Sequence, residues 1–129
     1  YWVKKALINN YNLFSKIENE SRHKIIYLNS QLNEKIKHIN YKETYSNYYI
    51  FPLLVKDRDL LVEKLFENNI EAGKHFQKSI EWAKEFGYVE GLCKKTDKIV
   101  TSIITIPVNK TVKEKELDKI LKIINENFV

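Results

Sequence analysis

The sequence predicts an α+β domain of two layers, a small sheet with helices packed on it, preceded by a long N-terminal helix. Three observations support this fold class. Strand and helix patterns alternate as β-α-β-α-β-α after residue 40. Hydrophobic residues make up 43% of the chain, with only 3 Gly and 2 Pro, which is typical of a folded core. A length of 129 residues suits one domain.

The N-terminal region has apolar residues at helical spacing and no Gly or Pro, so we expect one long helix over residues 2–39, or two helices broken near residues 18–21. Its stripe consists of Val3, Leu7, Tyr11, Phe14, Ile17, Ile25, Leu28, Leu32, Ile36 and Ile39. Such a helix exceeds the width of a small domain, so part of the stripe needs a partner outside this chain. Polar Ser21 disfavours a coiled coil. We therefore divide the chain into an interdomain helix or helix pair, residues 1–40, and a small α+β domain, residues 41–129.

The small domain begins with a predicted strand over residues 46–55, which is rich in aromatic and branched residues. Pro52 lacks a backbone donor and favours an edge position or a bulge. A helix with an acidic start follows over residues 57–67. The apolar face of this helix consists of Leu60, Leu61, Leu65 and Phe66. Asn68 or Asn69 can end it, because asparagine tolerates the left-handed conformation.

The second half of the domain contains a short extended piece over residues 70–76 and a helix over residues 79–86 that ends at Gly87. A loop is expected over residues 88–97 and a second strand over residues 98–108. The closing helix spans residues 111–128. Thr111 and Glu114 have the spacing of a capping box at its start.

Charge and composition exclude several classes of protein. The net charge is +5, but the lysines are mixed with glutamates as on an ordinary solvated helix face, so we expect no nucleic-acid partner. No apolar run is long enough for a membrane helix, so we expect no membrane partner. The single cysteine, Cys93, fits a reducing compartment, and we expect a cytoplasmic protein. The absence of methionine suggests a piece of a longer protein.

Residue chemistry alone indicates no complete active site. The histidines His23, His38 and His75 lack the spacing of a metal site, and the three glycines lie too far apart for a phosphate loop. Cys93 with His75 matches no thiol-enzyme motif. Aromatic residues that could stack bases, but more often form a core, are Tyr41, Tyr45, Tyr48, Tyr49 and Phe51. We therefore assign no catalytic, cofactor-binding or metal residue.

Four stretches in order resemble the C-terminal small domain of the DegT/StrS family of pyridoxal-phosphate-dependent nucleotide-sugar aminotransferases, which have fold type I. They are "YYIFPLLVKDRDLLVEKL", "NNIEAGKHF", "TSIITIPV" and "TVKEKELDKILKIINENF". Upstream, "SRHKIIYLNSQL" is similar to an Arg-led helix of the family, and "KALINNYNLF" to the helix that crosses from the large domain. The resemblance covers nearly the whole chain.

This sequence departs from the family pattern at several positions. Asn69 replaces the usual glycine, and Phe76 replaces a tyrosine and so loses a hydroxyl. Lys78, Ser79 and Ile80 stand where the family commonly has Pro-Leu-His, so a second histidine is absent. Lys113 occupies a position that is usually a capping Ser or Thr, and Thr111 is the available substitute.

The resemblance implies a parent enzyme that holds pyridoxal phosphate on a lysine of a large N-terminal domain, which this chain lacks. That enzyme would transfer an amino group from glutamate to a nucleotide-linked keto sugar, in cell-surface polysaccharide or related sugar biosynthesis, as a homodimer. The isolated chain would be inert and would not bind the cofactor. The alternative is a non-enzymatic interaction module that keeps the fold.

The resemblance also implies three residues that line the substrate cleft. His75, in the extended piece over residues 70–76 that follows the helix, would face the sugar nucleotide, with Phe76 beside it and Tyr49 on the first strand. The structural reading of His75, in which it only packs the turn, is favoured by the changes in its neighbours. In the isolated domain, Val3, Leu7, Tyr11 and Phe14 should be exposed and should promote self-association.

Overall fold

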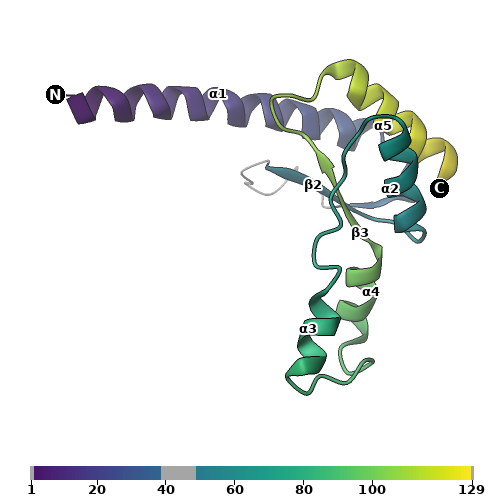
Figure 1. Ribbon diagram of the computed structural model, residues 1–129. Helices are drawn as coiled ribbons and strands as arrows, with labels where there is room; N and C mark the ends of the chain where they lie inside the picture. The colour runs from purple at the N-terminus through teal and green to yellow at the C-terminus, as the bar shows by residue number, and fades with distance from the viewer. Residues whose placement is uncertain (1, 39–48, 129) are drawn as a thin grey trace.

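The computed structural model describes residues 2–38 and 49–128. In chain order, its elements are α1 (Trp2–Gln31), β1 (Lys37–His38), β2 (Ile50–Leu54), α2 (Arg58–Glu67), α3 (Ser79–Glu85), α4 (Lys94–Ser102), β3 (Ile103–Pro107) and α5 (Glu114–Asn127). The predicted α+β class is confirmed, with helices packed around one small sheet (Figure 1). The predicted strand pattern is wrong in two places, because the piece over residues 70–76 contributes a single bridge and β1 was not expected.

The sheet is antiparallel in the order β1-β2-β3. β2 and β3 pair from Ile50 opposite Pro107 to Leu54 opposite Ile103. The predicted edge or bulge at Pro52 is wrong, since β2 is the central strand. The proline is compatible with this place because, among the described residues, β1 pairs with Leu53 and Leu54 of β2 and not with Pro52.

The core lies between β2, β3, α2, α5 and the second half of α1. Phe51 and Leu53 of β2 and Ile104 of β3 are fully buried in it. Leu61 and Leu65 of α2 are buried with them. Leu60 and Phe66, which were predicted on the same apolar face, are instead 48% and 74% exposed. From α1 and α5 the core receives Ile25, Leu28, Leu117, Ile120, Leu121 and Ile124.

α1 is a single helix of 30 residues without a break, and it ends at Gln31 instead of Ile39, which lies outside the described residues. Asn33 accounts for the early end. Its backbone N–H donates to the side chain of Asn125 at 3.0 Å, and its side chain accepts from the N–H of Lys35 at 3.0 Å, so a local turn replaces the next helical turn. The first half of α1 projects away from the sheet (Figure 1).

The predicted strand over residues 98–108 is wrong in its first half, because residues 98–102 belong to α4. Asp97 lies in the first turn of this helix, where its negative charge stabilises the positive end of the helix dipole. The hydroxyls of Thr101 and Ser102 donate to the carbonyl of Lys98 at 3.0 and 2.7 Å. Thr101, which is branched and favours strands, is therefore accommodated in the last turn of the helix. The α3–α4 pair projects from the sheet as a second extension (Figure 1).

The predicted capping box of Thr111 and Glu114 is also wrong. The N-cap is Lys113, whose backbone N–H donates to the carboxylate of Glu116 at 2.6 Å. Thr111 is held instead by Asn109, to which it donates through both its backbone N–H and its hydroxyl.

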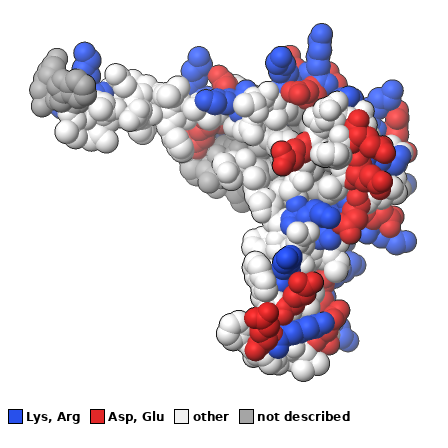
Figure 2. All heavy atoms as spheres, viewed as in Figure 1, with Lys and Arg blue, Asp and Glu red and all other residues white. Residues whose placement is uncertain are grey.

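The surface carries both signs of charge side by side, as Figure 2 shows for the face seen in Figure 1. Within residues 2–38 and 49–128, no helix combines the length and the apolar character that a membrane span needs.

Candidate functional site

A hollow of about 380 Å³ beside β3, which we call the His75 hollow, brings Tyr49 and His75 together. These two residues lie far apart in sequence, and both were predicted to line a cleft. The third predicted residue, Phe76, is not among the residues that line the hollow. The complete lining is Tyr49, Ile50, Glu71, Ala72, Gly73, His75, Thr105, Ile106, Pro107, Val108 and Asn109.

Strand pairing assembles the hollow. β2 places Tyr49 near the C-terminal end of β3, because Ile50 pairs with Pro107. On the other edge of β3, Gly73 pairs with Thr105 through two backbone hydrogen bonds of 2.9 Å. The polypeptide that carries His75 is therefore held along β3, and the hollow opens between these two attachments.

The predicted turn before this segment is confirmed at Asn69, whose φ of 60° is left-handed. The next backbone N–H, at Ile70, donates to the carbonyl of Leu65 at 2.9 Å and closes the end of α2. Ile70 is buried, so the turn is anchored in the core. This anchoring fixes where the segment toward His75 begins.

Phe76 has an unusual backbone. Its φ is 63°, which is rare for a bulky residue without a special reason. The side chain is 67% exposed, and its ring centroid lies 6.3 Å from that of His75 at a tilt of 53°. Strain of this kind, about 1–3 kcal/mol, clusters at sites with a functional constraint.

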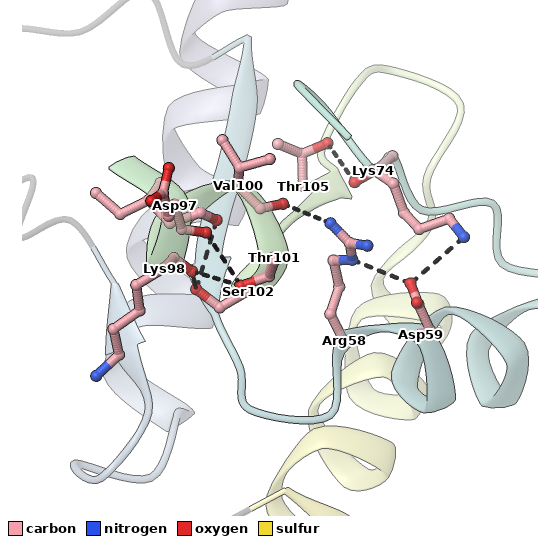
Figure 3. A network of polar contacts seen from close by, with 11 residues as sticks. Arg58, Asp59, Lys74, Asp97, Lys98, Val100, Thr101, Ser102 and Thr105 are labelled. Carbon is pink, nitrogen blue, oxygen red and sulfur yellow. Dashed lines mark hydrogen bonds and ion pairs between the residues drawn. The ribbon is translucent and has the colours of Figure 1, made fainter. Parts of the chain in front are cut away.

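A polar network holds the segment over residues 70–76, which we call the His75 segment, through Lys74 (Figure 3). Arg58, whose side chain is 11% exposed, donates to the carbonyl of Val100 at 2.6 Å and to the carboxylate of Asp59 at 3.0 Å. Lys74, the neighbour of His75, forms an ion pair with the same carboxylate at 3.4 Å. The hydrogen bond from Arg58 is the main cause that lowers the pKa of Asp59, and Lys74 adds to it. The network ties α2, the end of α4 and the His75 segment together.

The other candidate side chains lie apart from the hollow. The ring of His38 contacts the carbonyl of Ile36 at 2.9 Å, and His23 lines a separate hollow between α1 and α5. Cys93 is exposed at the start of α4 and does not line the His75 hollow. In the part of the chain that the structure describes, no three His, Cys, Asp or Glu side chains gather as a metal site would require. Tyr41, Tyr45 and Tyr48 lie outside the described residues.

Sequence reasoning assigned none of the other lining residues to a site, and these include Glu71, Gly73, Thr105 and Asn109. The sequence held one signal for Gly73, because an isolated glycine in an extended segment often marks a close approach of other atoms. Thr105 gave no signal, since a threonine in a strand is ordinary.

The lining of the hollow does not fit pyridoxal phosphate. That cofactor requires a lysine for its Schiff base and groups that bind its phosphate. The described residues that line the hollow include no Lys and no Arg. The chemistry that the hollow offers is hydrogen bonding by an imidazole, a phenol, a carboxylate and an amide to a polar ligand.

Comparison with known proteins gives one family and a group of related folds. Residues 13–125 match the model of the DegT/DnrJ/EryC1/StrS aminotransferase family. No curated protein matches the chain at a significant level. Among solved structures, the chain is similar to Spr1654 from Streptococcus pneumoniae, described as a sugar aminotransferase in its PLP form. The TM-score is 0.80 at 15% identity, over 92% of this chain and 33% of that one.

Two further structures give the same result. The aminotransferase TlmJ from Streptoalloteichus hindustanus has a TM-score of 0.74 at 9% identity, over 90% of this chain and 33% of that one. The sugar aminotransferase CalS13 from Micromonospora echinospora has a TM-score of 0.66 at 12% identity, over 88% and 31%. The chain therefore shares their fold and spans about a third of the length of these proteins.

Proposed function

We propose that this chain is the C-terminal small domain of a sugar aminotransferase, because it belongs to the DegT/DnrJ/EryC1/StrS aminotransferase family. In the complete enzyme, glutamate would give its amino group to the keto carbon of a nucleotide-linked sugar and leave as 2-oxoglutarate. Pyridoxal phosphate, held by the rest of the protein, would supply the electron sink for this exchange. The isolated chain is then inert.

The observation that carries the proposal is the match over residues 13–125, together with the His75 hollow. We assign this hollow to the sugar-nucleotide side of the cleft. The imidazole of His75 and the phenol of Tyr49 would bond to hydroxyl or phosphate oxygens of the substrate, and Phe76 would flank them. These side chains bind and orient the substrate.

The exposed first half of α1 supports a covering partner. Leu7, Tyr11 and Phe14 are 64%, 72% and 63% exposed. A continuous apolar stripe on a helix is rarely left exposed to solvent in a monomeric protein. We propose that the large N-terminal domain covers this stripe and that the complete enzyme is a homodimer. We also propose that the enzyme is cytoplasmic, because the exposed free thiol of Cys93 suits a reducing compartment.

The test is to express the full-length protein and record its visible spectrum with pyridoxal phosphate. We expect a Schiff-base band that shifts when glutamate is added, and amino transfer to a keto sugar nucleotide. The present chain alone is the matched control and should give neither signal. A full-length protein without the band and without transfer would contradict the proposal and favour the interaction module.

A further inference from the structure

We propose that Gly73 positions the imidazole of His75 in the hollow, because it leaves the space in which the ring rests. Gly73 is the positioning residue here, and His75 is the residue that meets the ligand. The inference rests on the proposed function, in which the hollow receives the sugar nucleotide.

The space around Gly73 is already filled by its neighbours. A β-carbon added to Gly73 would lie 2.6 Å from Oγ1 of Thr105, 3.0 Å from Nε2 of His75 and 3.2 Å from Cδ2 of the same ring. The first distance is shorter than real contacts of a β-carbon, and the other two are tighter than most. The ring edge of His75 thus occupies the place that a side chain at position 73 would need.

The requirement at position 73 concerns space and not backbone conformation. The glycines with positive φ are Gly87 and Gly91, at 86° and 97°, and both have open space where a β-carbon would be. Gly73 is the opposite case, with an ordinary φ and a crowded α-carbon. The backbone conformation at position 73 therefore suits an alanine, but the β-carbon of that alanine would clash with Thr105 and His75.

Of the two neighbours, His75 is the one that can move. Thr105 is 4% exposed, and its backbone N–H and carbonyl are both bonded to Gly73 at 2.9 Å. Its hydroxyl also donates to the carbonyl of Gly73 at 3.3 Å, and the strand that carries it is paired with β2 on the other side. His75 is exposed, and within residues 2–38 and 49–128 its ring has no hydrogen bond that would hold it against displacement. A larger residue at 73 should therefore displace the ring.

The experiment uses the full-length protein with Gly73→Ala, His75→Ala and the double variant of both. We expect His75→Ala to lower kcat/KM for the sugar nucleotide about tenfold, as for one lost hydrogen bond to a charged or polar ligand. Gly73→Ala should lower kcat/KM about fivefold or more, and less than about twofold when His75 is already alanine. Gly87→Ala is the control, since it adds strain at a positive φ far from the hollow and should leave kcat/KM unchanged.

A second readout does not depend on activity. With histidine-selective isotope labelling, the ring signals of His75 should shift in Gly73→Ala and stay in place in Gly87→Ala. Adding Thr105→Ala to Gly73→Ala removes Oγ1, the closest clash, and should return the signals and kcat/KM toward those of the unmodified protein. This double variant also keeps the test decisive if Gly73→Ala alone folds poorly.

Two results would overturn the inference. One is an unchanged His75 ring signal in folded Gly73→Ala. The other is an equal loss of kcat/KM from Gly73→Ala in the presence and absence of His75. Failure of the proposed function has a different signature, because a full-length protein without amino transfer would still report the position of the ring.

Discussion

The two halves of α1 have the same kind of sequence and opposite surroundings. Ile25 and Leu28 in the second half are 0% and 1% exposed, whereas Val3 and Leu7 in the first half are 74% and 64% exposed. Both halves carry apolar residues at helical spacing. The spacing therefore predicts which face of a helix is apolar, and the surrounding elements decide whether that face is covered.

The largest expected effect separates these halves directly. Leu28→Ala should lower the free energy of unfolding of the chain by about 2–5 kcal/mol, because it leaves a cavity in the core. Leu7→Ala, the matched variant in the first half, should change it by less than about 0.5 kcal/mol. Urea unfolding of both variants measures the difference. Equal losses would mean that the first half is covered in solution.

The next prediction concerns what covers the exposed stripe in the isolated chain. Leu7→Glu with Tyr11→Glu should weaken self-association about tenfold or more, because charges replace apolar contacts. Asn9→Glu with Asn12→Glu adds the same charges to another face of the helix and serves as the control. Sedimentation velocity over a concentration series measures both. A chain that stays monomeric at high concentration would contradict the prediction of self-association through this stripe.

The α3–α4 extension offers a third comparison, because its base is tied to the core through Arg58. Arg58→Gln loses the bond to the carbonyl of Val100 and the ion pair with Asp59, so we expect a cost of about 1–3 kcal/mol. Lys56→Gln, at an exposed position two residues earlier, should have almost no effect. Urea unfolding measures stability, and hydrogen exchange in α4 reports whether the loss is concentrated there. Unchanged exchange in α4 would show that Arg58 does not hold the extension.

Much of the fold was predictable because α2 and α5 have strong helical spacing. The predicted start of α5 at residue 111 was wrong, because the helix begins at Glu114 after the N-cap Lys113. α4 was missed since Ile99, Val100 and Thr101 have the branched side chains of a strand, and its hydrogen bonds to backbone carbonyls are visible only in three dimensions. The end of α1 was missed because Asn33 stops the helix with the help of Asn125, which lies far away in sequence.

The site was predictable only as separate residues. His75 and Tyr49 came from the resemblance to a family, and nothing in their spacing placed them in one hollow. Their meeting depends on the pairing of β2 with β3 and of Gly73 with Thr105. Pairing between distant segments has no local signature, so the crowding at Gly73 could not be read from the sequence.

The smallest expected effect concerns Asp59, whose carboxylate contacts both Arg58 of α2 and Lys74 of the His75 segment. Its pKa is lowered in the folded state, first by the hydrogen bond from Arg58 and then by Lys74. A carboxylate with a lowered pKa stabilises the fold above the pKa of the unfolded chain, and this contribution is lost as the pH falls through the folded value. Because the side chain is 69% exposed, screening by water should keep the contribution below about 0.5 kcal/mol.

Asp59→Asn should therefore reduce stability slightly at neutral pH and flatten the decline of the urea midpoint below about pH 4. Glu63→Gln on the same helix is the control and should leave the decline in place. A decline that is equally steep in Asp59→Asn and in the unmodified chain would assign the acid sensitivity to other carboxylates. The contacts of Asp59 with Arg58 and Lys74 would then make no measurable electrostatic contribution to the free energy of unfolding.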